Sequence, residues 1–216
     1  MNNTLKDYFE KISEVKQRTD EEIIKIKISS GDIALKVIDN SIETVSLSTK
    51  WRAENLKWFL TTFVPDNEKS EKWIQDSILD NPGRILFMIY LNGKKIGQTG
   101  LDRYVSEDNS IDVTGTIKDR SVKDPKVMEY TRKALCKWAF DYLNVSKIIF
   151  RVFSDNYRNI NLIERCGALT VNSIPMKKIV ENGHPKWVEL KSEKDEDISK
   201  RYLNIMEIKK ENFKID

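Results

Sequence analysis

The stretch RVFSDNYRNINLIERCGALT, residues 151–170, places a polar side chain where chemistry is possible. Its first residues have the apolar pattern of a strand, and an amphipathic helix follows and ends at Cys166-Gly167. Asn156 stands at the junction between the two. An asparagine there can cap the helix, because its side-chain oxygen accepts a hydrogen bond from a free amide of the first turn. The same side chain could also hold a molecule in a gap beside the strand.

Few other side chains in the sequence are suited to nucleophilic or metal chemistry. The only histidine, His184, lies between Gly183 and Pro185 in a predicted turn, and we expect it to take no part in a reaction. Two cysteines, Cys136 and Cys166, provide neither a disulfide framework nor a set of four metal ligands. Both lie in apolar helical segments, which indicates a packing role, and no metal site is expected.

The composition argues against several classes of protein. A chain of 216 residues suffices for one substantial domain. Its 37 basic and 34 acidic residues leave a net charge of +3, without the clustered excess typical of nucleic-acid binders. No run approaches the roughly 18 apolar residues of a membrane span. The charged N-terminus lacks the apolar core of a signal peptide. We expect a cytoplasmic monomer or homodimer that binds neither nucleic acid nor membrane.

The first half of the chain predicts three helices and two short strands. Residues 1–22 form an amphipathic stripe typical of a peripheral helix, made by Leu5, Tyr8, Phe9, Ile12 and Val15. Residues 23–39 contain two short strands around a Ser-Ser-Gly-Asp turn. NSIE, residues 40–43, fits a capping box that begins a helix ending near Asn55. That helix is expected to direct Ile42, Val45 and Leu47 partly inward. Another helix precedes Asn81-Pro82-Gly83.

The second half alternates strands and helices. Asn92-Gly93 predicts a hairpin between two strands, and residues 110–117 add a third antiparallel strand. Beyond Pro125 a helix carries an apolar stripe of Met128, Thr131, Leu135, Trp138 and Tyr142. A strand at 147–153, the helix after Asn156, and strands at 168–174 and 201–208 follow, with a turn near 180–187 and a solvated charged run at 191–200. This order predicts a single α/β domain.

The order of elements and several short motifs resemble the GNAT superfamily of acyl-CoA-dependent N-acetyltransferases. NYRNINLIERCGA, residues 156–168, is similar at most spaced positions to the family pattern N-x-x-[S/A]-I-x-L-x-E-x-x-G-[F]. WRAEN, residues 51–55, resembles a segment of the branch that holds amino-sugar and protein N-terminal acetyltransferases. GKKIGQTGL and RYLNIMEIKKENF resemble the family's central hairpin and last strand. The resemblance covers about residue 33 to the end. It implies an extension of a peripheral helix and strand at 1–30 and an acetyltransferase domain at 31–216.

The resemblance implies an α/β (α+β) fold with a mixed, mostly antiparallel central sheet flanked by helices. In this family two neighbouring parallel strands, here 112–117 and 148–153, splay apart. The pantetheine arm of acetyl-CoA fills the gap and pairs with backbone groups that would otherwise be buried without partners. By this implication Thr116, Ile117, Asn156 and Arg158 contact the cofactor.

The pyrophosphate of the cofactor is implied to lie at the N-terminus of the helix beginning near Val127, where free amides attract anions. Such families usually have several glycines in the preceding loop, and RSVKDPKV, residues 120–127, has none. Arg120, Lys123 and Lys126 could supply positive charge instead. The alternative is a degenerate site in a non-catalytic, GNAT-shaped binding module.

Acetyl transfer to an amine requires that a base remove a proton from the ammonium form. Asp112 is the first candidate, because related enzymes often carry an acid on the strand before the cofactor loop; Glu54 and Asp102 are weaker candidates. Many relatives have a tyrosine as general acid where this sequence has Ile163, so water or Tyr157 could take that role. We expect the oxyanion donor to be a backbone amide within 114–117.

The acceptor is implied to bind near the end of the first domain helix, where Arg52, Asn55 and Trp58 cluster. An arginine can hold a phosphate or carboxylate with two parallel hydrogen bonds. The alternative is that the tryptophans at 51, 58 and 73 belong to the core. The resemblance of WRAEN and RVFSDN to the family implies an amino sugar, free or linked to a nucleotide, as the acceptor of direct transfer from acetyl-CoA. A protein N-terminus, a lysine or an antibiotic amine is the alternative.

Overall fold

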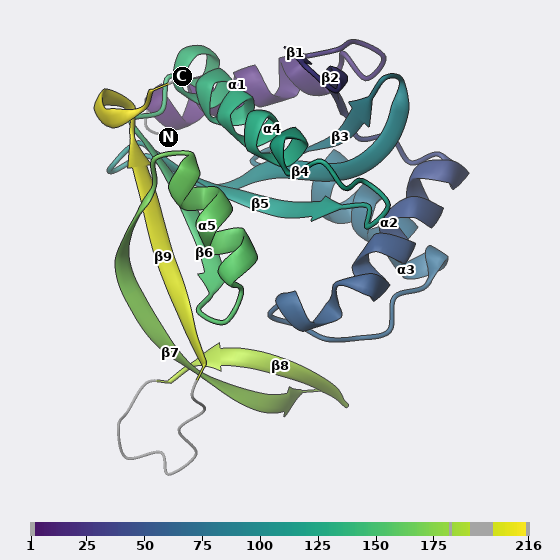
Figure 1. The fold of residues 1–216 in the computed structure, drawn as a ribbon, viewed down its shortest axis with the longest axis vertical. Coiled ribbons are helices and arrows are strands. Elements are labelled where there is room, and N and C mark those ends of the chain that lie inside the picture. The colour runs from purple at the N-terminus through teal and green to yellow at the C-terminus, as the bar shows by residue number, and fades with distance from the viewer. Residues whose placement is uncertain (1–2, 182, 191–200, 215–216) are drawn as a thin grey trace.

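A computed structural model describes residues 3–181, 183–190 and 201–214, and within them one nine-stranded sheet runs through the molecule (Figure 1). The strand order is β1-β2-β3-β4-β5-β6-β9-β7-β8, and β5 and β6 form the one parallel pair among the described strands. The strands are β1 (Ile24–Ile28), β2 (Gly31–Val37), β3 (Ile85–Leu91), β4 (Lys94–Val105), β5 (Ser110–Lys118), β6 (Lys147–Phe153), β7 (Leu169–Glu181), β8 (His184–Glu189) and β9 (Arg201–Lys209). The mixed, mostly antiparallel sheet predicted from the sequence is confirmed.

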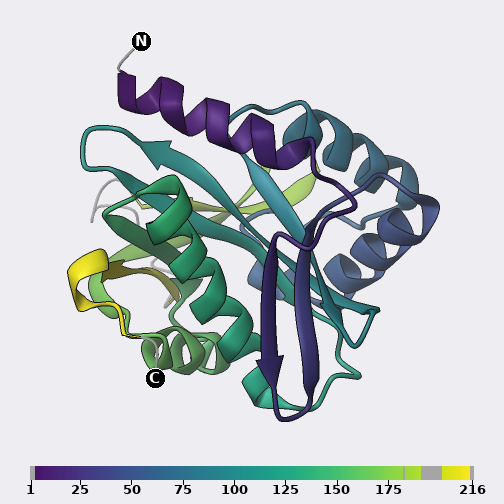
Figure 2. The ribbon, with the colours of Figure 1, turned by 90° about the horizontal axis from the view of Figure 1, so that it is seen from above.

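Helices cover both faces of this sheet. The α-helices are α1 (Asn3–Lys16), α2 (Ile42–Glu54), α3 (Asn67–Ile74), α4 (Pro125–Trp138) and α5 (Tyr157–Arg165), and short helical turns are η1 (Leu56–Trp58), η2 (Gln75–Leu79), η3 (Ala139–Leu143) and η4 (Lys210–Asn212). Figure 2 shows α1 and α4 across one face, with α2 and α3 beyond the strands. None of the helices in the described part of the chain combines the length and the apolar character needed to cross a membrane.

Alternation along the strands decides which side chains each face receives. Ile111 of β5 and Phe150 of β6 belong to the larger core, which also contains the apolar sides of α1, α4 and α5. Leu86, Met88 and Ile117 belong to a second core beneath α2 and α3. Asp112 of β5 and Arg151 of β6 alternate with the larger-core residues, so they lie on the α2 side of the sheet.

The first domain helix begins differently from the prediction. Ser41, not Asn40, is the N-cap of α2, and its side chain accepts a hydrogen bond from the amide of Thr44. Ile42, expected to face partly inward, is 90% exposed, whereas Val45 is buried. The prediction placed the N-cap one residue too early. A shift of one residue changes the expected direction of each side chain in the first turn by about 100°.

The N-terminal segment is packed onto the sheet. Tyr8, Ile12 and Val15 of α1 are buried in the larger core, as their predicted stripe implies. The Tyr8 hydroxyl donates a hydrogen bond of 2.8 Å to the carbonyl of Gly83. Strand β1 pairs with β2 along its whole length. Residues before 31 therefore contribute both a helix and an edge strand to the same body.

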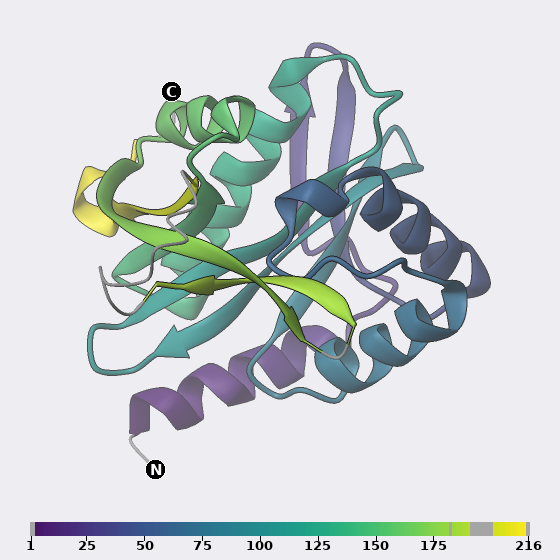
Figure 3. The ribbon, with the colours of Figure 1, turned by 90° about the horizontal axis from the view of Figure 1, so that it is seen from below.

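The C-terminal strands form a longer structure than predicted. The strand expected at 168–174 continues to Glu181, and a strand β8 replaces most of the expected turn. The charged run at 191–200 and residue 182 lie outside the described residues. Figure 3 shows the β7–β8 hairpin reaching below the sheet toward the loop after η1. There Thr61 forms a bridge with Lys186, and the Trp187 amide donates 2.7 Å to the Leu60 carbonyl.

The parallel pair β5–β6 separates midway. Pairing runs from Ser110↔Lys147 to Val113↔Phe150 and stops there, although β5 continues to Lys118 and β6 to Phe153. A bulge against β4 follows this point, and Gly115 within it has a φ of 64°, a left-handed conformation that glycine adopts without strain. The bend is consistent with β5 leaving β6 here. The predicted splay of the central strands is present.

A buried polar contact connects α2 to the loop after β5. Trp51 is fully buried, and its indole Nε1 donates a 2.8 Å hydrogen bond to Asp119 Oδ2. The Ser121 amide donates 2.8 Å to Oδ1 of the same carboxylate. Hydrogen bonds from Ser121 and Trp51 hold the pKa of Asp119 well below its ordinary value. The contact fixes the end of α2 against the loop that leads into α4.

Replacing Asp119 with Asn should lower the free energy of unfolding by about 1–3 kcal/mol near neutral pH, because the variant loses charge-assisted hydrogen bonds. The folded-state pKa is lowered, so this stabilisation is present above the ordinary pKa of 3.8 and is lost as the pH falls through the folded-state value. Urea unfolding of wild type and Asp119→Asn at about pH 7 and about pH 3 measures the difference. A gap of equal size at both pH values would contradict the assignment.

Candidate active site

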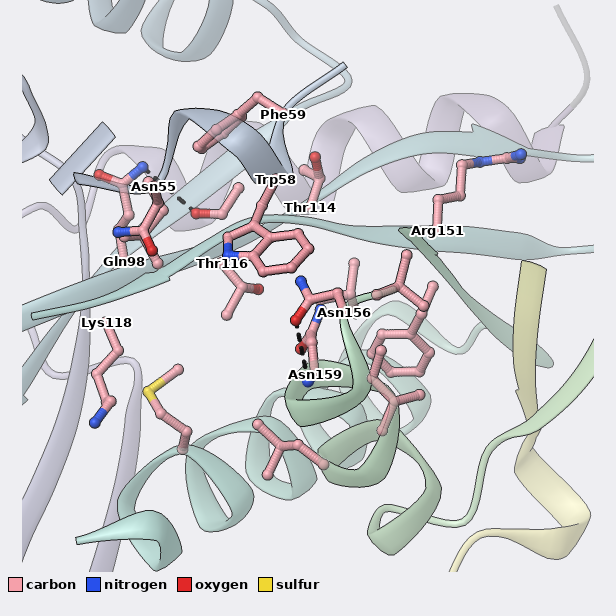
Figure 4. Close-up of a pocket in the computed structure, with 18 of the residues that line it drawn as sticks. Asn55, Trp58, Phe59, Gln98, Thr114, Thr116, Lys118, Arg151, Asn156 and Asn159 are labelled. Carbon is pink, nitrogen blue, oxygen red and sulfur yellow. Dashed lines mark hydrogen bonds between the residues drawn. The ribbon is translucent and has the colours of Figure 1, made fainter. Parts of the chain in front are cut away.

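A cavity of about 890 Å³ opens where β5 and β6 separate. One wall is formed by the end of α2 and the loop through η1, and the other by the N-terminal parts of α4 and α5. Figure 4 shows Trp58 and Thr114 on one side of this cavity and Asn156 and Asn159 on the other. We call the part lined by α2, η1 and the α2 face of the sheet the acceptor side, and the part lined by α4, α5 and the loop after β5 the cofactor side.

Backbone groups in the gap need partners. Beyond Val113, the edge of β5 that faces β6 has no strand against it, while β6 beyond Phe150 still pairs with β9 on its other edge. Buried amides and carbonyls without partners are costly, so an extended molecule that supplies amides of its own would stabilise this arrangement. The pantetheine arm of acetyl-CoA has that chemistry, and the gap fits it.

Asn156 caps α5 and lines the cavity. Its Oδ1 accepts a hydrogen bond of 3.4 Å from the amide of Asn159, drawn as a dashed line in Figure 4. The capping interpretation of Asn156 is therefore confirmed, and its side-chain NH2 group remains as a donor. The cofactor interpretation of the same residue stays a prediction. The two roles are compatible, because the cap uses the side-chain oxygen and a contact with the cofactor would use the side-chain NH2 group.

Arg132 is the most unusual side chain of the cofactor side. It is only 3% exposed, and its Nη2 donates 3.1 Å to Asn159 Oδ1. Its Nε and Nη1 are buried without a hydrogen-bond partner among the described residues, and burial lowers its pKa. A buried guanidinium with two free donors is unfavourable unless a ligand supplies acceptors. The pantetheine amides or a phosphate of acetyl-CoA would satisfy these donors, which supports the fit of this group.

The loop before α4 departs from the expected phosphate site. The helix begins at Pro125, two residues before Val127, and the proline has no amide hydrogen to offer an anion. Asp124 caps it, with Oδ1 accepting 2.8 Å from the Lys126 amide and Oδ2 accepting 2.6 Å from Ser30. A carboxylate thus occupies the helix N-terminus where an anion was expected. Lys126 is exposed and Val127 is buried in the core, and neither lines the cavity.

Side-chain cations stand beside that loop instead. Lys118, Arg120, Lys123 and Arg158 line the cofactor side. Burial, followed by the charges of Arg158 and Lys123, lowers the pKa of Lys118. The positive charges of Lys118, Lys123 and Arg158 therefore act on one another, and a phosphate beside them would reduce their repulsion. Side chains, and not the amides of a glycine-rich loop, therefore provide the positive charge on this side of the cavity.

The acceptor side contains the three residues predicted there. Arg52, Asn55 and Trp58 all line the cavity, and Trp58 belongs to none of the hydrophobic cores. The core interpretation is thus wrong for Trp58, whereas Trp51 is wholly buried and Trp73 packs partly against the second core. Thr116 and Ile117 also line the cavity, and Thr116 shares a 2.8 Å hydrogen bond with Thr99.

Asp112 lies in the cavity wall with two arginine partners. It is 5% exposed, and its Oδ2 accepts 2.7 Å from Arg151 Nε and 3.1 Å from Arg103 Nη1. Arg103 stands at an irregularity of β4 with a φ of 54°. Asp102, opposite Asp112 in the β4–β5 register, is paired with Arg84 at 3.4 Å and does not line the cavity.

Other candidates lie away from the cavity. Glu54 does not line it; its buried Oε2 has no hydrogen-bond partner among the described residues and lies 4.0 Å from Arg120 Nε. His184 is exposed at the start of β8. Tyr157 is 71% exposed, and Ile163 is buried beside the cavity. Burial raises the pKa of both Cys136 and Cys166, which keeps them as unreactive thiols.

Several cavity residues escaped the sequence analysis. Arg84, Arg103 and Arg151 lie in or beside strands, where nothing in the sequence marks their direction. Arg132 carried a signal, because it falls four residues after Met128 and four before Cys136, both on the buried side of α4. A charge on an apolar helix face predicts a buried functional group.

A sheet that opens midway, a cationic cofactor side and an acceptor side on the opposite face together define an acyltransferase that uses an extended thioester carrier. A family model described as an acetyltransferase (GNAT) domain matches residues 40–169, more than half of the chain. The chain therefore belongs to the GNAT acetyltransferases and is an acetyl-CoA-dependent N-acetyltransferase. The resemblance found in the sequence is confirmed at the level of the superfamily.

Solved structures share this fold. A spermidine N-acetyltransferase from Vibrio cholerae, in complex with CoA and spermine, is 13% identical, with a TM-score of 0.66 over 83% of this chain and 96% of that one. A protein of T. thermophilus assigned to the acetyltransferases is 15% identical, with a TM-score of 0.63 over 88% and 90% of the two chains. At these identities the likeness is one of fold. A comparison with curated proteins gives no significant match.

The two roles of Asn156 can be separated by substitution. Asn156→Asp keeps the capping oxygen but removes the amide donor, so we expect an unchanged melting temperature and a KM for acetyl-CoA raised about tenfold. Asn156→Ala should raise KM similarly and also lower the free energy of unfolding by about 1 kcal/mol. Steady-state kinetics and thermal unfolding provide both readouts. An Asp variant with the wild-type KM would leave Asn156 as a cap alone.

Asp124 should weaken cofactor binding. Asp124→Asn retains a capping oxygen but removes a negative charge from the helix N-terminus, so we expect the Kd for CoA to fall by about two- to fivefold, the effect of one charge near a helix dipole. Titration calorimetry measures this gain, with Asp108→Asn as the matched control, because Asp108 pairs with Lys147 outside the cavity. A Kd that rises in Asp124→Asn would place the phosphates elsewhere.

Proposed function

We propose that this enzyme transfers the acetyl group of acetyl-CoA to the primary amine of a small molecule by direct attack within a ternary complex. The observation that carries this proposal is the cavity that passes through the gap between β5 and β6 and is lined from both faces. A thioester carrier in the gap and an amine on the acceptor side can meet there without a covalent intermediate on the protein. No cysteine of the described residues lines the cavity to carry one.

The reaction makes one bond and breaks one. The amine nitrogen forms a bond to the thioester carbonyl carbon, the carbon–sulfur bond breaks, and CoA leaves as a thiolate that gains a proton. The ammonium form of the amine loses one proton before attack, and the nitrogen loses a second proton as the amide forms, which balances the proton gained by the thiolate. Because a free thiol has a pKa of about 8.5, the thiolate leaves without a strong acid, which is consistent with Ile163 in place of a tyrosine. A backbone amide at the Gly115 bulge is proposed to donate to the carbonyl oxygen.

Two features favour removal of the proton from the amine. The cationic side chains of the lining repel the ammonium form of a bound amine, and this repulsion lowers the pKa of the amine. Among the described residues, Asp112 is the one carboxylate that lines the cavity, and we propose it as proton acceptor, directly or through water. Both arginine contacts are made to Oδ2, so Oδ1 is the oxygen that these ion pairs leave for another partner.

An amino sugar, free or nucleotide-linked, remains our proposed acceptor. Its support is the resemblance of residues 51–55 to the amino-sugar branch, together with Trp58, an aromatic side chain in the cavity that suits stacking on a sugar or base. Polyamine acetylation is a second candidate, because the Vibrio cholerae relative is named for spermidine. The charge of the cavity argues against a polyamine. Its described lining includes eleven lysine and arginine side chains and one acid, and this excess of positive charge would repel a polycation.

An acceptor panel tests the proposal. Purified enzyme with acetyl-CoA is mixed with amino sugars, nucleotide-linked amino sugars, peptides with free N-termini, aminoglycosides and spermidine, and thiol release is recorded. We expect turnover with at least one amine and identification of the N-acetyl product by mass. Tight CoA binding without any turnover would favour the alternative of a non-catalytic binding module.

Asp112→Asn should lower kcat/KM by about a hundredfold near neutral pH, the usual contribution of a general base. The deficit should shrink as the pH rises above the amine's pKa, because the acceptor then arrives without its extra proton. A pH profile of kcat/KM distinguishes this from a structural role, in which the deficit would be the same at every pH. Asp108→Asn is the control for loss of an ion-paired aspartate outside the cavity.

A further inference from the structure

We propose that the amine acceptor carries a carboxylate or phosphate group and that Arg52 binds this anion on the acceptor side. The inference rests on the proposed function and adds the chemical class of the acceptor. It distinguishes this enzyme from one that acetylates a polyamine, whose charge is wholly positive.

Arg52 has the environment of a guanidinium prepared for an anion. It lines the cavity, and its planar group stacks on Phe59 at 4.3 Å and Phe63 at 4.4 Å from the ring centroids. Its Nη2 donates 3.2 Å to the Thr61 carbonyl, while its buried Nε has no hydrogen-bond partner among the described residues. Stacking fixes the plane of the guanidinium and leaves its edge to donate a forked pair of bonds.

The other arginines of the acceptor side have carboxylate partners. Arg84 pairs with Asp102, and Arg103 and Arg151 share Asp112. No carboxylate of the described residues lies within 4.0 Å of the Arg52 guanidinium. Burial lowers the pKa of Arg52, which reflects the cost of keeping this charge without a partner. An anionic group on the ligand would offset that cost, because a partly buried charge without a partner is unfavourable.

The distribution of charge supports the same conclusion. The chain as a whole carries only +3, yet the described cavity lining holds eleven cationic side chains and one acid. Phosphates of CoA account for the cations near the loop after β5, namely Lys118, Arg120, Lys123 and Arg158. They do not account for Arg52 or Lys57, which lie at the opposite wall on α2 and η1. Excess positive charge there attracts an anion and repels a polycation.

Matched acceptor pairs test the proposal. Glucosamine is compared with glucosamine 6-phosphate, and a dipeptide amide with the same dipeptide bearing a free carboxylate; spermidine is the polycation. We expect kcat/KM to be about tenfold or more higher for the anionic member of at least one pair, the effect of a charge-assisted forked contact. Preference in the first pair identifies phosphate, and preference in the second identifies carboxylate.

Substitution of Arg52 supplies the second readout. In Arg52→Gln the ratio of kcat/KM between anionic and uncharged members should fall about tenfold, whereas in Arg52→Lys, which keeps the charge but loses the fork, it should fall less. A ratio is used because a partial loss of folded enzyme does not alter it. Arg18→Gln is the matched control, since Arg18 is partly exposed, pairs with Glu21 and lies outside the cavity.

The outcomes separate this inference from the proposed function. Turnover that is equal or better with the uncharged members or with spermidine, or a ratio unchanged in Arg52→Gln, would overturn the inference while the acetyltransferase proposal stands. If no amine is acetylated, the proposed function fails on this panel. Calorimetric binding of the same pairs to the protein–CoA mixture then decides the inference: tighter binding of an anionic member supports it, and equal binding overturns it.

Discussion

The end of pairing between β5 and β6 is the constraint on which the rest of this molecule depends. Two parallel strands that part after Val113 and Phe150 leave backbone donors and acceptors inside a protein, where they need partners. The bulge at Gly115 and the pairing of β6 with β9 fix the strands in these positions. The structure thus keeps a slot whose natural occupant is another extended chain of amides, and the two faces of the sheet become the two entrances to one reaction site.

The charged residues differ between the two sides of the cavity. On the cofactor side Asp124 occupies a helix terminus that related enzymes leave to phosphate, and lysine and arginine side chains provide the charge. On the acceptor side an aspartate between two arginines is the only acid of the described lining. The same residue types therefore do different things on the two sides. On the cofactor side the cations outnumber the nearby acids and attract anions, whereas on the acceptor side the cations paired with Asp112 fix the position of one carboxylate.

Much of the fold could be predicted because its signals are local. The Asn-Gly hairpin, the apolar run of β3 and the Asn156 cap each depend on a few adjacent residues, and the motif from Asn156 to Gly167 placed them in a family. Ser41 and Asn40 compete as caps with equally suitable side chains, so the choice depends on how the chain arrives from β2. Arg103 and Arg151 were missed because a strand's direction is fixed by its neighbours, not by its own residues.

The hairpin of β7 and β8 has a consequence for access to the site. Strand β8 contacts the loop after η1 through the Thr61–Lys186 bridge and the hydrogen bond from the Trp187 amide to the Leu60 carbonyl. The outer wall of the acceptor side is therefore anchored to a hairpin that extends from the sheet through β7. These contacts hold the wall in one position relative to the sheet. The reach of the hairpin sets the width of the opening, and lengthening or shortening it would select acceptors by size without any change to the residues that perform the transfer.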